Sequence, residues 1–138
     1  NKDFLQVSIT LKIKPDWHIN SASPINNNLI PTQVDLLNKV DWQVDKVDYP
    51  QHQVINLDFN QDEPLALYQG NITINMFLSK RKPLATEKPL AEEKELAINK
   101  SITTRNPIIN LRFQACSDKI CLLAENITLY PNGLSRKQ

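Results

Sequence analysis

Two cysteines are the residues of this chain best suited to chemistry, because thiols can be oxidised, bind metals or attack other disulfides. Cys116 and Cys121 are separated by four residues and lie between two segments with the pattern of adjacent strands. A turn between strands can bring the two α-carbons within the ~4.4–6.8 Å that a disulfide requires. We therefore expect that this pair can be oxidised to a disulfide.

Two roles for such a disulfide remain open. As a structural staple, a closed loop of about six residues would constrain the unfolded chain by only ~2 kcal/mol. Two close thiols also suit exchange, in which one thiolate attacks a partner's disulfide and the second resolves the mixed disulfide. Arg112 and Lys119 would favour a thiolate and Asp118 would oppose it, so the attacking cysteine is not identified.

Other chemistries find less support in the sequence. A zinc site built from both cysteines with His18 and His52 would need spacings that match no structural zinc motif, so we expect no metal and no cofactor. No serine or carboxylate is placed to complete a catalytic relay with His18, which predicts a hydrogen-bonded structural histidine. His52 is expected in an exposed loop.

The elements that must position the cysteines are predicted to be strands, because apolar and polar residues alternate along much of the chain. The clearest alternation covers residues 7–13, 40–44, 72–78, 109–113 and 127–129, with shorter candidates at 17–19, 32–37, 53–59 and 95–102. No window has an apolar pattern at helical spacing. Eight or nine strands with turns about every ten residues predict an all-β antiparallel β-sandwich.

Length and composition predict one domain over residues 1–132, with residues 133–138 as a loose polar tail. The net charge of +1 provides no field to attract nucleic acid. No apolar run approaches the ~18 residues of a membrane span, so we expect no membrane insertion of this domain. The charged stretch from Lys80 to Glu95 is interpreted as an exposed connection, and its Lys80-Arg81-Lys82 run as a solvated face rather than an anion site.

Turn chemistry must come from a residue other than glycine, since the chain has only two glycines. Asparagine occurs fifteen times, and it enters the left-handed backbone region more readily than most residues. We therefore expect asparagines to occupy the left-handed turn positions. The asparagines at expected turns are residues 26–28, 60, 106 and 132.

Three stretches, in this order and spacing, resemble a known family. They are Trp17-His18-Ile19-Asn20 followed by Leu29-Ile30-Pro31-Thr32, then Tyr68-Gln69-Gly70 before an apolar strand, and Phe113-Gln114-Ala115-Cys116 through Cys121-Leu122. Together they are similar to the N-terminal domain of the transmembrane thiol:disulfide reductase DsbD and its relatives. The resemblance implies an immunoglobulin-like β-sandwich in the periplasm or another extracytoplasmic compartment. Its catalytic pair, Cys116 and Cys121, would take electrons from a membrane-embedded partner domain and pass them to thioredoxin-fold proteins.

The resemblance also implies a cap loop, with an aromatic and an acidic residue, that covers the cysteines until a partner docks. Counting back from Tyr68 places this loop near residues 58–64. Phe59 would be the shielding ring, and either Asp58 or the pair Asp62 and Glu63 would be the acid. The residues assigned to the cap loop are Asp58, Phe59, Asp62, Glu63 and, at its end, Tyr68.

A different class of function fits the same strand pattern. A β-sandwich can serve as a non-catalytic interaction module that takes up a partner's strand at a sheet edge. The disulfide would then only hold a recognition loop in place.

Overall fold

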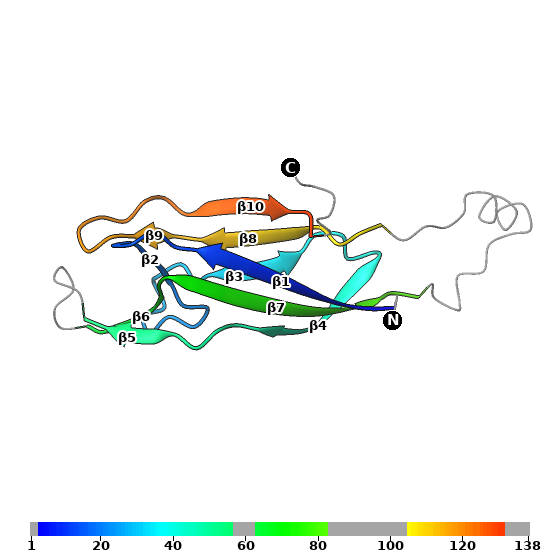
Figure 1. Cartoon of the computed structure of the whole chain (residues 1–138), viewed down its shortest axis with the longest axis horizontal. Coiled ribbons are helices and arrows are strands. Elements are labelled where there is room, and N and C mark those ends of the chain that lie inside the picture. Colours follow the sequence, from blue (N-terminus) through cyan, green and yellow to red (C-terminus); the bar gives the residue numbers. More distant parts are fainter. Residues whose placement is uncertain (1–2, 57–62, 83–104, 132–138) are drawn as a thin grey trace, which may run out of the picture.

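The computed structural model describes residues 3–56, 63–82 and 105–131 of the 138-residue chain (Figure 1). Within these ranges the chain forms ten strands and no helix, so none of the described segments could cross a membrane as a helix. The strands are β1 (Phe4–Lys12), β2 (His18–Asn20), β3 (Gln33–Leu36), β4 (Trp42–Asp48), β5 (Gln53–Ile55), β6 (Leu65–Tyr68), β7 (Asn71–Lys80), β8 (Ile109–Phe113), β9 (Ala115–Cys116) and β10 (Glu125–Leu129).

The strands form three antiparallel sheets with the orders β1-β7-β4, β10-β8-β3 and β5-β6-β2-β9. The first two sheets run along the length of the molecule and enclose its core, and the third lies at one end (Figure 1). We call the first two the sandwich and the third the end sheet. The predicted all-β antiparallel sandwich is confirmed, with ten strands in the described residues where eight or nine were expected.

The core of the sandwich consists of alternate residues from the facing sheets. In β7, Ile74, Met76 and Leu78 are almost completely buried, and the residues between them point outward. Val7 and Ile9 of β1 occupy the same layer. Each such side chain stabilises the fold by about 1.5–3 kcal/mol on full burial, so the sandwich has a source of stability independent of the cysteines.

The alternation predicted at residues 40–44 is only partly right. Val40 precedes β4 and is 85% exposed, whereas Trp42 is buried as expected. Val44 points to the inner face but is 40% exposed, because β4 is an edge strand. A β-bulge between Val44 and Lys46 then shifts the pairing, and Val47 rather than Lys46 packs against the core.

The proposed role of asparagine in turns is wrong for the described residues. The only described residues with positive φ are Asp16, at 71°, and Gly70, at 73°. Asparagine acts through its side chain instead, because an amide can bond the backbone in place of a second peptide group. The Asn38 side chain donates to the Asn106 carbonyl at 2.8 Å and accepts from the Ile108 amide at 2.9 Å.

Strand β6 was not predicted from alternation. All four of its residues are buried, because β6 lies between β5 and β2 and neither of its faces is open to solvent. A short strand that is buried on both faces has a continuous apolar run and no period of two. The alternation rule therefore does not detect it.

Several expectations fall outside the described residues. They are the cap-loop positions 58, 59 and 62, the strand candidate at 95–102, most of the connection at 80–95, the turns at 60 and 132, and the tail at 133–138. Of the basic run, Lys80 ends β7, and the Arg81 side chain donates to the Lys39 carbonyl at 2.7 Å. This contact occupies one donor of the Arg81 guanidinium.

Candidate functional site

Cys116 and Cys121 form a disulfide across a tight β-hairpin. The Leu122 amide donates to the Ala115 carbonyl at 2.9 Å, so the next residues along the hairpin, the two cysteines, are a pair without backbone hydrogen bonds. Such pairs have the closest α-carbons in an antiparallel ladder, about 4.5 Å apart. The α-carbons here are 4.0 Å apart. The register of the hairpin therefore brings the two thiols together.

The turn of this hairpin is held by a serine hydroxyl. The Ser117 amide donates to the Ile120 carbonyl at 2.7 Å, and the Ser117 Oγ accepts from the amides of Lys119 and Ile120 at 3.0 and 3.1 Å. Neither Asp118 nor Lys119 at the tip has positive φ. A hydroxyl that accepts from the amides two and three residues ahead stabilises a turn without glycine.

The two cysteines differ sharply in exposure. Cys116 belongs to β9, which pairs with β2, and it is 4% exposed. Cys121 lies on the outer arm of the hairpin and is exposed. Cys121 is therefore the more accessible residue of the pair, while Cys116 is buried.

The residue beside Cys116 is a buried histidine. His18 is 3% exposed and lies directly opposite Cys116 in the β2–β9 register. Directly opposed residues of an antiparallel pair project to the same face, with Cβ atoms about 4.5–5.5 Å apart. The imidazole of His18 and the sulfur of Cys116 are thus neighbours on one face of the end sheet.

The protonation of His18 follows from this burial. Desolvation lowers the pKa of the imidazole below its ordinary value, and the carboxylate of Asp118 partly opposes that shift. The expected hydrogen bond is not found, since the imidazole makes none to any residue in the described ranges. A neutral histidine with an uncommitted ring nitrogen next to a sulfur can donate to, or accept a proton from, that sulfur.

Strand β2 is held in place by buried polar groups. The Asn20 side chain donates to the Ile30 carbonyl at 2.9 Å, and the Thr32 hydroxyl donates to the Asn20 carbonyl at 2.6 Å. These bonds join the two parts of the first resemblance stretch, residues 17–20 and 29–32. Both polar side chains are buried, so each bond fixes the position of β2 closely.

A second group of bonds joins the end of β2 to β6. The Ser21 hydroxyl and the His52 Nδ1 are 3.0 Å apart, and the Ala22 amide donates to the Tyr68 hydroxyl at 3.2 Å. His52 lies outside the strands, as expected, but it is partly buried and hydrogen-bonded, so the expectation that it is exposed is wrong. Its partner could not be found from the sequence, because nothing in the local pattern around Ser21 points to a residue thirty-one positions away.

The predicted cap-loop residues are only partly described. Tyr68 is the last residue of β6 and is 2% exposed, so it belongs to a strand and not to a loop. Glu63 is exposed and precedes that strand. Asp58, Phe59 and Asp62 lie outside the described residues.

The predicted charged neighbours of the cysteines separate into two places. Asp118 and Lys119 lie at the exposed tip of the hairpin, whereas Arg112 belongs to β8 in a different sheet. In residues 3–56, 63–82 and 105–131, no cluster of three or more His, Cys, Asp or Glu side chains could hold a metal ion. Of the predicted groups, the structure brings together Cys116, Cys121 and His18.

Comparison with known proteins does not identify this site. No protein family matches the chain, and no curated protein is significantly similar to it. What can be said about function therefore depends on the geometry of the hairpin and on the resemblance described above.

Proposed function

We propose that this domain carries out thiol–disulfide exchange, with Cys116 and Cys121 alternating between a disulfide and a dithiol. One observation carries the proposal, namely a disulfide in a tight hairpin with one exposed and one buried cysteine. A staple across so short a loop stabilises the fold by only about 2 kcal/mol. Because the apolar core of the sandwich already stabilises the fold, this small stabilisation is a weak explanation for the presence of the disulfide.

The exposure of Cys121 supports an order of steps. A thiolate of a reduced partner attacks the Sγ of Cys121, a mixed disulfide forms, and Cys116 leaves as the thiolate. The partner's second thiolate then attacks the partner's first sulfur, which is bonded to Cys121 in the mixed disulfide. This step releases Cys121 as a thiolate. Two electrons pass to the domain, the partner becomes the disulfide, and two protons complete the dithiol. When the reduced domain passes its electrons to an oxidised partner, Cys121 is the attacking thiolate and Cys116 is the resolving one.

His18 is the group placed to assist the buried sulfur. When Cys116 leaves as a thiolate, the adjacent neutral imidazole can donate a hydrogen bond to it through its N–H. A stabilised leaving thiolate departs faster.

The partners follow from the resemblance to the DsbD N-terminal domain. They would be thioredoxin-fold proteins on one side and a membrane-embedded or fused redox domain on the other. The location would be the periplasm or another extracytoplasmic compartment, which is where disulfides usually persist. No cofactor takes part in this chemistry.

The reduction potential tests the proposal. We expect thiol trapping across a graded redox buffer to place the pair in the range of thioredoxin-fold proteins, about −120 to −270 mV. A disulfide that stays oxidised below about −300 mV would be structural. The domain would then be better described as a non-catalytic interaction module.

A matched pair of variants tests the order of steps. Cys116→Ser leaves the exposed thiol, which should trap a thioredoxin-fold partner as a stable mixed disulfide. Cys121→Ser leaves the buried thiol, which should react with an aromatic disulfide reagent at least about tenfold more slowly. Equal rates in the two variants would show that burial does not select the attacking cysteine.

A further inference from the structure

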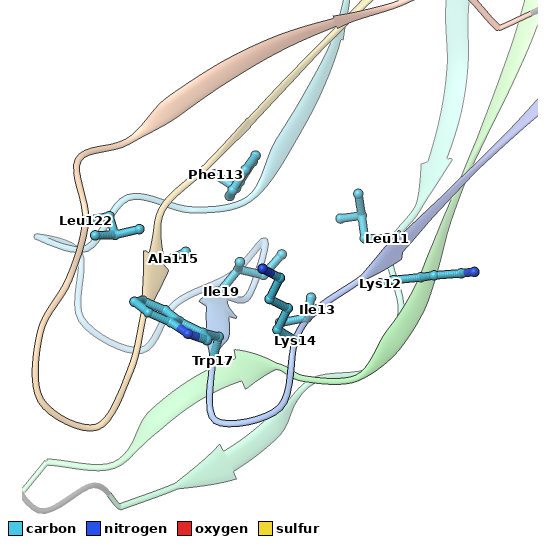
Figure 2. A pocket seen from close by; sticks show the side chains of 9 residues that line it. All are labelled: Leu11, Lys12, Ile13, Lys14, Trp17, Ile19, Phe113, Ala115 and Leu122. Atoms are coloured by element: carbon cyan, nitrogen blue, oxygen red, sulfur yellow. The ribbon is translucent and has the colours of Figure 1, made fainter. Parts of the chain in front are cut away.

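A pocket of about 370 Å³ opens on the other face of the disulfide hairpin (Figure 2). It lies where the end of β1, the start of β2 and the β8–β9 segment meet. Seven of its lining residues are apolar and two are lysines. They are Leu11, Lys12, Ile13, Lys14, Trp17, Ile19, Phe113, Ala115 and Leu122.

Strand alternation separates this pocket from the redox face. Ala115 and Leu122 are next to the cysteines along the hairpin, so their side chains point away from the disulfide. Trp17 and Ile19 flank His18 in the same way. The disulfide and the pocket therefore lie on opposite sides of the same part of the end sheet.

A tight turn brings the polar groups of the pocket into place. The Trp17 amide donates to the Lys14 carbonyl at 3.1 Å, with Pro15 second and Asp16 third in the turn. Proline followed by a residue with positive φ, here 71° at Asp16, is the pattern of a type II turn. The turn reverses the chain, so that Lys14 and Trp17 border the same pocket.

The Lys14 ammonium and the Trp17 indole N–H are available to a ligand. In Figure 2 the Lys14 side chain extends back over Ile19, among the apolar lining, whereas the Lys12 side chain extends away from it. No residue in the described ranges forms an ion pair with Lys14 or a hydrogen bond with the Trp17 indole. The pocket thus combines an apolar wall with one cation and one neutral donor.

We propose that this pocket binds a small amphipathic anion, an unbranched aliphatic chain that ends in a carboxylate. The chain would lie on Ile19, Phe113 and Leu122, and burial of its methylene groups would supply about 0.8 kcal/mol each. The carboxylate would accept from the Lys14 ammonium and the Trp17 Nε1–H. The volume lies at the lower end of the ~300–1,000 Å³ typical of small-molecule sites, which favours a single chain.

The charge of the pocket distinguishes this occupant from others. The Lys14 side chain lies among the apolar lining and no acidic residue lines the pocket, so a cationic amphiphile would meet repulsion where a carboxylate meets attraction. A neutral chain would gain only the apolar contacts. The proposal does not depend on the exchange reaction, because it involves neither cysteine.

The test uses the 138-residue chain and three probes with the same chain length. Decanoate, decanol and decylamine are titrated below their aggregation limits while tryptophan fluorescence is recorded. We expect decanoate to bind most tightly and decylamine least. The fluorescence change should disappear in Trp17→Phe, because the remaining Trp42 lies in the sandwich core and bonds the Arg105 carbonyl.

Two lysine variants make the test specific. Lys14→Gln should weaken decanoate binding about fivefold, the upper range for an exposed ion pair, and leave decanol binding unchanged. Lys12→Gln is the matched control, and it should weaken decanoate binding much less than Lys14→Gln because the Lys12 side chain extends away from the apolar lining. Both lysines are exposed, so neither change should alter the melting temperature.

Three results with the soluble probes would overturn the proposal. They are no binding of decanoate, equal binding of all three probes, and equal effects of the two lysine variants. A response to anionic phospholipid vesicles without any response to monomeric decanoate would also overturn it, because it would identify a membrane surface as the ligand.

Discussion

The sandwich and the end sheet are stabilised in different ways. Every buried residue of the sandwich core is apolar. All four described buried polar residues, His18, Asn20, Ser21 and Thr32, lie in β2 or beside it. The sandwich depends on buried apolar area, which tolerates small shifts, whereas the end sheet combines the buried apolar side chains of β6 with hydrogen bonds between buried polar groups, which tolerate such shifts less.

This difference has a consequence for the disulfide. Cys116 is attached to β2 through the short β9, so the bonds that position β2 also position the sulfur against His18. Substitutions in the sandwich should therefore change the stability of the whole domain, and substitutions around β2 should change the disulfide as well.

The largest expected effect is in the sandwich core. Ile74→Ala should lower the free energy of unfolding by about 2–5 kcal/mol, because it leaves a cavity at a fully buried position. The measurement is urea denaturation followed by tryptophan fluorescence. The reduction potential of the disulfide should stay unchanged. Ile127→Ala, at a position 38% exposed, is the control and should cost far less. A large change in potential in Ile74→Ala would contradict the separation of the two regions.

A smaller effect is expected from one hydroxyl of the end sheet. Thr32→Val preserves the shape of the side chain but leaves the Asn20 carbonyl without its donor, so it should cost about 1–3 kcal/mol. Urea denaturation measures the loss, and thiol trapping should show a shifted reduction potential. Thr10→Val is the matched control, because the Thr10 hydroxyl is exposed on the sandwich and its loss should change stability by less than about 0.5 kcal/mol. Equal losses of unfolding free energy in Thr32→Val and Thr10→Val would contradict the special role of buried hydrogen bonds in the end sheet.

The smallest expected effect is a pH dependence from His18. Its pKa is lower in the folded state than in the unfolded state, where it is about 6.5. As the pH falls below about 6.5, the unfolded state binds the proton first and stability decreases, until the folded pKa is passed and the decrease ends. Above that range both states are neutral and His18 adds no pH dependence. Unfolding free energies at pH 8 and pH 5 should therefore differ more in the wild type than in His18→Gln. Identical pH profiles would show that the imidazole is not desolvated.

Local pattern alone predicted a large part of the fold. The strict alternation in β1 and β7 identified both strands and the faces that they bury, because a strand with one buried face must repeat every second residue. The cysteine spacing likewise predicted a disulfide at a turn. Alternation was less informative at β4, where a bulge shifts the register, and at β6, which is buried on both faces.

The tertiary structure alone decided the chemistry of the site. The exposure of Cys121 and the burial of Cys116 depend on β2, which covers only one arm of the hairpin. The pairing of His18 with Cys116 depends on the register of two strands that are only three and two residues long. Periodicity is a property of neighbouring residues and can be seen in the sequence. Register and burial come from contacts between residues far apart along the chain, and they exist only once the sheets have packed.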